Sequence, residues 1–242
     1  MGGIMARQQI QKPFSEQRHR LHVMRAQKIT SEARFLLQDI FEAWQLKLAL
    51  LDRPFVSALE LSAMPPMAES LGIDAPHVQH ISALEGSYDL IMAPLLLDVA
   101  NDPAMALRRC WEHLQPDGVL LTACLGEDNL RDFVQAVMHT EMSQSQGAAA
   151  RFHPRISLQD IAGLALHVGF TNPVVDKDQL SVRYQHLHSF AKDMRAHGLQ
   201  NSLTDMRPLT KTLLNEINEK LLGPQSMALR FEILHLTAFR GS

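Results

Sequence analysis

The side chains best suited to chemistry in this chain are its histidines, because imidazole can bind a metal or move a proton near neutral pH. The sequence has 12 histidines, and three pairs are closely spaced: His19 and His22, His77 and His80, and His186 and His188. A zinc site needs three or four ligands at characteristic spacings. No HExxH pattern, paired-cysteine spacing or nearby carboxylate completes any of these pairs. The sequence therefore predicts no metal site.

A polar stretch rich in small residues, 143–156, carries a second set of candidates. Its basic side chains are Arg151, His153 and Arg155. Guanidinium and imidazole groups suit contact with an acidic substrate. We predict a mobile loop here that lies over a ligand crevice, with Arg151 and His153 joined there by Asp98 and Tyr184 as substrate contacts. The alternative, that the charges of the loop are only solvated, stays open.

The elements that must position these residues alternate between strand and helix. Apolar runs of strand length occur at 55–61, 88–93 and 119–125. Before the last of them, Asp102 and Pro103 form a helix start, because the aspartate accepts from free amides and the proline has its φ already set. Uniformly apolar strands are typical of a parallel sheet covered on both faces. We predict a mostly parallel twisted α/β sheet with helices on both faces and an antiparallel last strand.

Further elements follow from periodicity and from capping residues. Thr30 or Ser31 can cap a helix that runs to Leu51. Ser157 with Asp160 starts another helix, and Gly169 ends it. The remaining predicted elements are a helix at 67–71, a strand at 78–81, a helix from 128, a strand at 173–175, helices at 185–197 and 209–222, and a strand at 229–239.

Composition sets broad limits on function. Of 242 residues, 46% are apolar and 20% are charged, and the formal net charge is −3, which gives no reason to expect a nucleic-acid partner. No apolar run approaches the roughly 18 residues of a membrane span. Two cysteines lie inside apolar stretches, which favours a reducing, cytoplasmic environment. No G-x-S-x-G motif supports a hydrolase.

The start of the chain differs from the rest in its charge. We divide the sequence into a polar segment, 1–29, and a single domain, 30–242. Within the first segment one acid, Glu16, stands against six cations: Arg7, Lys12, Arg18, Arg20, Arg25 and Lys28. Such a run is either a solvated helix face or a helix that touches something acidic. The sequence leaves both open.

Several motifs of the second half follow one another in a fixed order. Tyr88-Asp89-Leu90-Ile91 precedes Asn101-Asp102-Pro103, and Leu114-Gln115-Pro116-Asp117-Gly118 and Leu166-His167-Val168-Gly169-Phe170 come after. This order resembles the class I S-adenosylmethionine (SAM) methyltransferases. There an F-D-L-I/V strand, a helix, an L-K-P-G/D-G turn and an L-x-x-A-G-F segment occur in turn. The resemblance covers about residues 86–242 and implies a Rossmann-like fold with SAM as the cofactor.

Finer features narrow the resemblance. They are Phe14-Ser15-Glu16-Gln17-Arg18, Cys124-Leu125-Gly126, Arg151 to Leu164, Pro173-Val174-Val175-Asp176 and Phe231-Glu232-Ile233. Together they resemble the type 11 subgroup that contains the mitochondrial complex I assembly factor of methyltransferase type. The biotin-pathway enzyme that methylates the malonyl carrier protein is related to it. The resemblance implies a protein partner, and it leaves the oligomeric state open.

The segment that should hold the cofactor departs from this family. The family binds SAM through a D/E-x-G-x-G-x-G loop after strand one, whose glycines let the backbone approach the ligand. The aligned segment is Leu59-Glu60-Leu61-Ser62-Ala63-Met64-Pro65-Pro66, which keeps the acid as Glu60 but has no glycine. Its two prolines also lack the N–H that could donate to a ligand.

The same half of the chain is also shorter than in the family. Only 26 residues separate Leu61 from Tyr88, where the family has two helices, a second strand ending in a ribose-binding acid, and a third strand. Average element lengths require roughly 35 residues before any loop is counted. We therefore predict a shortened N-terminal half in which the second strand and its acid are lost. Asp74, the only Asp in the interval, has no strand before it.

The resemblance also gives a set of cofactor residues and two functions. SAM, if it still binds, would contact Glu60, Leu61, Ser62, Ser82, Ala83 and Ala93. Ser82 and Ala83 align with the family's adenine-contacting D-A pair, without the acid. The losses favour a methyltransferase-like pseudoenzyme that acts as an assembly or regulatory factor through protein contacts. The alternative is an active SAM-dependent methyltransferase with a glycine-free cofactor loop.

Overall fold

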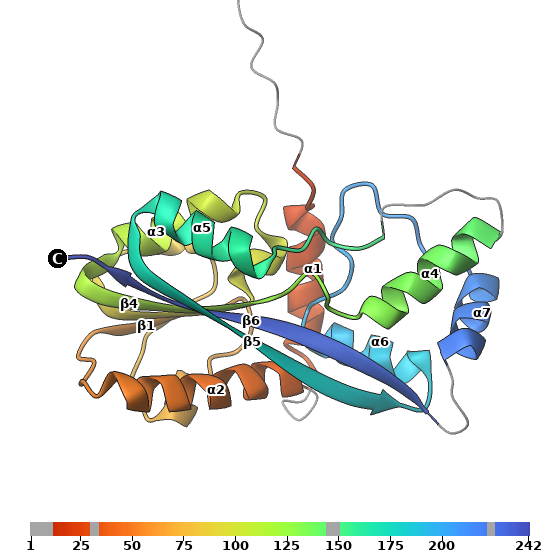
Figure 1. The fold of residues 1–242 in the computed structure, drawn as a ribbon, viewed down its shortest axis with the longest axis horizontal. Helices are drawn as coiled ribbons and strands as arrows, with labels where there is room; N and C mark the ends of the chain where they lie inside the picture. The colour runs from red at the N-terminus through yellow and green to blue at the C-terminus, as the bar shows by residue number, and fades with distance from the viewer. Residues whose placement is uncertain (1–11, 30–33, 144–150, 222–225) are drawn as a thin grey trace, which may run out of the picture.

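A single twisted sheet runs through the molecule (Figure 1). The computed structural model describes residues 12–29, 34–143, 151–221 and 226–242. The strands are β1 Ala58–Leu61, β2 His77–Val78, β3 Tyr88–Pro94, β4 Leu114–Leu125, β5 Phe170–Tyr184 and β6 Met227–Arg240. Their order is β2-β1-β3-β4-β6-β5. The first four run parallel, and β6 is antiparallel to both of its neighbours, β4 and β5.

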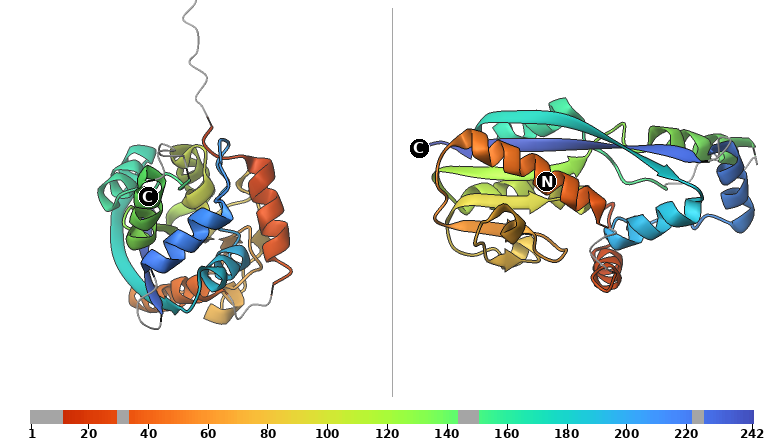
Figure 2. Two further views of the ribbon diagram at one scale, coloured as in Figure 1. Left: turned by 90° about the vertical axis from the view of Figure 1, so that its right-hand side faces the viewer. Right: turned by 90° about the horizontal axis from the view of Figure 1, so that it is seen from below.

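Helices cover both faces of this sheet. They are α1 Glu16–Ala26, α2 Phe35–Leu51, α3 Pro103–Glu112, α4 Arg131–Ser143, α5 Leu158–Val168, α6 Leu187–Ala196 and α7 Lys211–Leu221, with short 3-10 helices η2 Ala68–Leu71, η3 Ile81–Ala83 and η4 Leu96–Val99. One core cluster joins α3 and α5 to a sheet face, and another joins α2 and α6 to the opposite face (Figures 1 and 2). The predicted α/β class, the covered sheet and the antiparallel last strand are confirmed.

Local capping rules explain where the best-predicted helices begin and end. The Asp102 carboxylate accepts the Met105 N–H at 2.8 Å, and Pro103 is the first residue of α3. The Ser157 hydroxyl accepts the Asp160 N–H at 3.1 Å at the start of α5. Gly169 ends that helix with φ of 114°, a conformation that favours glycine. The predicted Thr30 or Ser31 cap of α2 lies outside the described residues.

The N-terminal half of the sheet is shortened, as the interval before Tyr88 predicts. Between β1 and β3 the chain forms only two short 3-10 helices and the two-residue strand β2, which pairs with β1. In doubly wound sheets the second strand lies beside the first and the third lies outside it. The structure therefore keeps only one short strand on this side of β1, which confirms the shortened N-terminal half. That the missing strand is the second one, with its acid, stays a prediction. Asp74 precedes β2, and the residues directly after β2 are Gln79 and His80, so no acid stands at the end of that strand.

The C-terminal hairpin is longer than predicted. The sequence indicated a strand only at 173–175, whereas β5 continues to Tyr184 and pairs with β6 along its length. Because β5 is an edge strand with mostly exposed side chains, its sequence contains no continuous apolar run. The far part of the hairpin extends beyond the parallel strands, and α4, α6 and α7 gather there (Figure 1). Their apolar side chains pack on Leu229 and Phe231 of β6.

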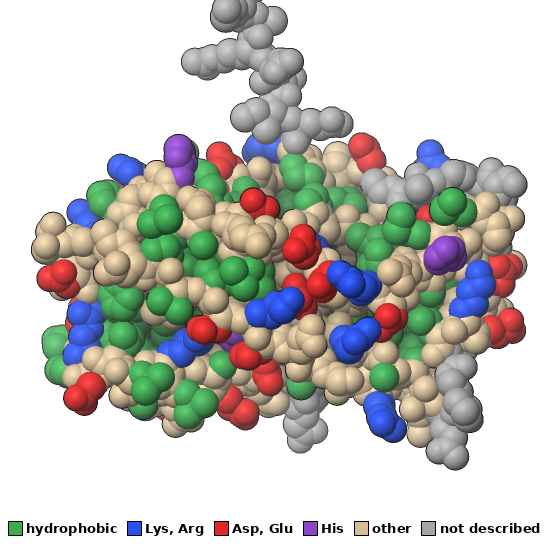
Figure 3. All heavy atoms as spheres, viewed as in Figure 1, with side chains coloured by type: hydrophobic (Ala, Val, Ile, Leu, Met, Phe, Trp, Pro, Cys, Tyr) green, Lys and Arg blue, Asp and Glu red, His purple; other side chains and the backbone are tan. Residues whose placement is uncertain are grey.

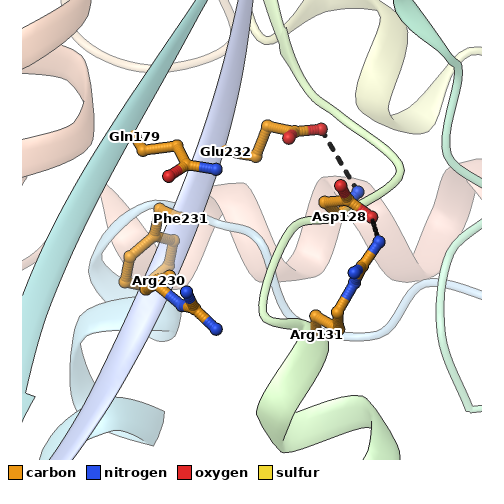
Figure 4. Close-up of a pocket in the computed structure, with 6 residues that line it drawn as sticks. All are labelled: Asp128, Arg131, Gln179, Arg230, Phe231 and Glu232. Carbon is orange, nitrogen blue, oxygen red and sulfur yellow. Dashed lines mark hydrogen bonds and ion pairs between the residues drawn. The ribbon is translucent and has the colours of Figure 1, made fainter.

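Gly126, directly after β4, shows how closely the hairpin approaches the parallel strands. Its N–H donates to the Glu232 carbonyl at 3.0 Å. The buried Glu232 carboxylate turns back to accept the Asp128 N–H at 3.2 Å (Figure 4). It also pairs with Lys177 at 2.9 Å. A Cβ at position 126 would lie 2.2 Å from one carboxylate oxygen and 3.0 Å from its carbon. A side chain at this position would therefore force the buried Glu232 carboxylate to move.

We expect Gly126→Ala to reduce the free energy of unfolding by about 1–3 kcal/mol, because the buried Glu232 side chain must shift. Urea unfolding at neutral pH measures the change. Gly163→Ala is the matched control, since a Cβ there meets nothing within 4 Å. In the interior of α5 that substitution should stabilise the chain by roughly 0.5–1 kcal/mol. An unchanged midpoint for Gly126→Ala would contradict the close contact.

Candidate functional site

The candidate site lies at the carboxyl ends of β1 and β3. In open α/β sheets, ligands bind outside the carboxyl ends of the strands, where the strand order reverses. Here the reversal falls between β1 and β3. β2 lies on one side of β1, whereas β3 and then β4 lie on its other side. The loops that leave these strands begin at Ser62 and at Leu95.

An apolar cluster fills this position. Val23 and Ala26 from α1 are buried against Leu37 of α2 and Met64 of the loop after β1. Leu95, which follows β3, packs on the same cluster. The helix α1 therefore lies directly over the place where the fold would otherwise offer a crevice.

Backbone and side-chain hydrogen bonds fix this arrangement. We call residues 12–29 the N-terminal cap. The cap exchanges two hydrogen bonds with Asn101: the Phe14 N–H donates to its side chain at 2.9 Å, and the Asn101 amide donates to the Phe14 carbonyl at 3.1 Å. Ser15 N–H donates to the Ser202 carbonyl at 2.8 Å. Gln27 donates from its side chain to the Ala63 carbonyl at 3.0 Å, which joins the cap to the loop after β1.

Glu60, the acid retained from the cofactor motif, is used by its own loop. Its side chain is 1% exposed, and one carboxylate oxygen accepts the N–H groups of Met67 and Ala68 at 2.8 and 2.7 Å. Burial raises the pKa of this carboxyl, and the two amides offset part of the effect. Ser62 is also used within its own loop, because its hydroxyl accepts the Met64 N–H at 3.1 Å. Both side chains stabilise the fold of the loop.

The other predicted cofactor residues are distributed differently. Leu61 and Ala93 are buried in β1 and β3, and the Ala93 carbonyl accepts the Thr122 hydroxyl at 2.7 Å. Ser82 and Ala83 are exposed in η3, after β2. The structure thus brings Glu60, Leu61 and Ser62 together at the end of β1, whereas Ser82 and Ala83 lie on the surface.

A cavity of about 220 Å³ remains between the cap and the ends of β1 and β2. Its lining residues are His19, Arg20, Val23, Met24, Gln27, Ala63, Gln79 and His80. Burial, with smaller effects from His22 and His80, lowers the pKa of His19 to about 4. Ligand pockets usually measure roughly 300–1,000 Å³. SAM carries a sulfonium and an ammonium cation and a ribose diol, yet no carboxylate lines this cavity, so its residues do not fit the cofactor.

The predicted substrate residues Asp98 and His153 lie together beneath the cap. Asp98 is 4% exposed, forms an ion pair with Arg155, and accepts the Leu125 N–H at 3.3 Å. Burial raises the pKa of Asp98 to about 6, although Arg155 opposes the change. The His153 ring accepts the Ser202 N–H at 2.9 Å and packs edge-on against Phe14. Burial and then Arg155 lower its pKa to about 4.

Arg151 and Tyr184 lie elsewhere. Arg151 pairs with the buried Glu141 at the end of α4 and donates to the Arg207 carbonyl. Tyr184 packs against Phe190 of α6, in the core cluster on the α2 face of the sheet. The predicted loop, 143–156, is described only from 151 onward, apart from Ser143, which ends α4. The predicted division into 1–29 and 30–242 stays a prediction.

The most consequential contacts were not visible in the sequence. Phe14 and Asn101 are 87 positions apart. Neither residue type predicts which residue it will contact. The only signal was that both fall within motifs of the same resemblance. Among the described residues, no group of three His, Cys, Asp or Glu side chains is placed to hold a metal. The described helices include none that is long and apolar enough to cross a membrane.

Comparison with known proteins agrees with the fold. A Bacillus halodurans protein assigned to the methyltransferases superposes with a TM-score of 0.52 over 83% of this chain and 98% of that chain, at 10% identity. No family model matches the sequence. The chain has the fold of the class I SAM methyltransferases.

Curated sequences place it more narrowly. It is 29% identical over 49% of its length to malonyl-[acyl-carrier protein] O-methyltransferase 1 of Coxiella burnetii, covering 39% of that protein. It is 25% identical over 64% of its length to the mitochondrial arginine-hydroxylase NDUFAF5 of Danio rerio, covering 50% of it. The chain is thus similar in sequence, over about half of its length or more, to proteins of the subgroup that its motifs resemble. It spans half or less of the length of these relatives.

We expect the buried His153 to make stability depend on pH. Because its folded-state pKa is lowered, its contribution is present above the unfolded value of about 6.5 and is lost as the pH falls through about 4. Asp98, whose pKa is raised, acts in the opposite direction. His153→Gln keeps a hydrogen-bond acceptor but does not titrate. Between pH 7 and pH 4 it should lose up to about 3 kcal/mol less free energy of unfolding than the unmodified chain.

Urea unfolding at several pH values measures this difference. His139→Gln is the matched control, because His139 is exposed on α4 and should leave the pH dependence unchanged. If the free energy of unfolding changes equally with pH in His153→Gln and in the unmodified chain, protonation of His153 does not destabilise the fold.

Proposed function

We propose that this chain is a non-catalytic protein with a methyltransferase fold, which acts as an assembly or regulatory factor through protein contacts. The observation that carries the proposal is the apolar cluster at the carboxyl ends of β1 and β3. Val23 and Ala26 are 8% and 0% exposed there, so α1 is packed into the crevice position as a core element. SAM would have to displace these contacts before it could reach the end of β1.

The chemistry of the loop after β1 supports the same conclusion. A working cofactor loop presents backbone amides to its ligand, and glycines allow the close approach. Here the Met67 and Ala68 amides donate to Glu60, and Pro65 and Pro66 have no N–H. The donors that a ligand would need are therefore satisfied within the chain or missing.

The comparisons do not require catalysis by methyl transfer. The curated relatives carry names for two different reactions, O-methylation of a carrier protein and hydroxylation of arginine. Similarity at this level therefore does not fix a reaction for this chain. The compartment is also a prediction: the sequence favours the cytoplasm, whereas the hydroxylase relatives are described as mitochondrial.

One feature favours the alternative, an active SAM-dependent methyltransferase with a glycine-free loop. The second carboxylate oxygen of Glu60 is buried and has no hydrogen-bond partner among the described residues. Together with the adjoining cavity of about 220 Å³, it leaves an acceptor near the expected position of the cofactor. The same oxygen is shielded from solvent, however, and Glu60 is not among the residues that line the cavity.

Calorimetric titration of the full chain with SAM, and separately with S-adenosylhomocysteine, distinguishes the two functions. We expect no binding tighter than about 100 μM, which corresponds to roughly −5.5 kcal/mol. The malonyl-[acyl-carrier protein] O-methyltransferase of Coxiella burnetii, titrated under the same conditions, is the positive control. A cooperative unfolding transition of the titrated sample verifies that the chain is folded. Tighter binding of either compound would overturn the proposal in favour of the alternative.

A further inference from the structure

The helix α1 has two chemically different faces. Its inner face, with Val23 and Ala26, belongs to the apolar cluster described above. Its outer face is exposed and combines cations with two apolar side chains: Arg20, Leu21, Met24 and Arg25, continued by Lys28. Leu21 is 44% exposed and Met24 is 52% exposed. Figure 2 (left) shows α1 on an outer flank of the molecule, on the side opposite β5.

The positive charge of this face is not neutralised within the described chain. Arg20, Arg25 and Lys28 form no ion pair with any described residue, although ion pairs are common elsewhere on the surface. Glu16, the acid of the helix, pairs with Lys12 at 3.1 Å. Burial lowers the pKa of His22, and the neighbouring charges of Arg25 and Arg18 lower it further.

The cavity beneath the cap adjoins the same face. Arg20 and Met24 belong both to the exposed face and to the cavity lining, and Val23 and Ala63 add apolar surface. Gln79 and His80, which follow β2, are exposed and lie on its other side. A concave apolar site beside a charged rim is the usual form of a pocket that receives an anchoring side chain of a partner.

We propose that the outer face of α1 and this cavity form a docking site for an acidic segment of a partner protein. The segment places carboxylates against Arg20, Arg25 and Lys28, and it inserts one large apolar side chain into the cavity. This inference rests on the proposed function and names the surface through which the protein contacts are made. Complementary charge then sets the rate and the specificity of association, and the anchor supplies affinity.

The structure favours a protein segment over a membrane or a nucleic acid. Helices that bind membranes usually insert a broad apolar face with aromatic residues, whereas α1 exposes only Leu21 and Met24 as large apolar side chains. Phosphate groups would use the cations but would leave the cavity and both apolar side chains without a partner. An acidic segment with an apolar anchor uses all of them.

Fluorescence anisotropy of the full chain with a labelled peptide of alternating glutamate and leucine tests the site. We expect saturable binding that weakens about tenfold or more for the double variant Arg20→Glu, Arg25→Glu, and that also weakens with rising salt. Arg183→Glu is the matched control, because Arg183 is exposed on β5 and should leave binding unchanged. Ala63→Leu fills the cavity without changing charge, and it should weaken binding by a similar factor.

Two peptide controls separate charge from anchor. Replacing leucine by serine in the peptide should remove the effect of Ala63→Leu, and replacing glutamate by glutamine should remove the effect of the charge reversals. No binding, or binding that the double variant does not weaken, overturns the proposal. So does binding of phosphatidylserine vesicles or single-stranded RNA that depends on Arg20 and Arg25 when the peptide does not bind. SAM binding would overturn the proposed function and leave this peptide result unaffected, so the two failures are distinguishable.

Discussion

The packing of α1 against the loop after β1 is the contact on which the rest of the site depends. Val23, Ala26, Leu37 and Met64 form a small core of their own, separate from the two clusters on the faces of the sheet. Burying such side chains is worth about 1.5–3 kcal/mol for each large one. A ligand at the end of β1 would compete with that energy. Because Val23 and Ala26 make this contact, the outer face of α1 is not buried in the core.

The loop after β1 shows why the glycine motif can be absent without loss of the fold. Glycine is needed where a backbone must approach a ligand, because a Cβ would intervene. Here the loop approaches its own Glu60 side chain, and Met67 and Ala68 supply the amides. Met64 then points its side chain into the apolar cluster, a contact that glycine could not make. A methionine in place of a glycine at such a position fills the space that a cofactor would need, and it adds a packing contact with α1.

Sequence patterns predicted the elements whose cause is local. Asp102 with Pro103, and Ser157 with Gly169, fix helix ends through contacts within a few residues, and the structure confirms them. β5 was mostly missed because an edge strand with solvated side chains needs no apolar run. The residue count predicts that an element is missing between β1 and β3, and the structure confirms it, but the count alone does not say which element that is.

The site was less predictable because its contacts span the whole chain. A motif points to Glu60 and Ser62, yet their partners are amides of the same loop, which no motif describes. The predicted substrate contacts Asp98 and His153 do lie near each other, and Arg155 interacts with both. The contact of Phe14 with Asn101 depends on how the cap folds back, and therefore on every turn between them. Only tertiary packing decides such pairs.

The buried polar groups beneath the cap explain how it can be held in one position. A buried ion pair such as Asp98–Arg155 adds little net stability, because desolvation offsets the attraction. Misplacing it is costly, however, since each charge would then be buried alone. Asn101, with its two bonds to Phe14, and His153, with its bond to Ser202, act alike. Apolar contact therefore supplies the energy that keeps α1 over the crevice, whereas these polar pairs select the single orientation in which its cations face outward.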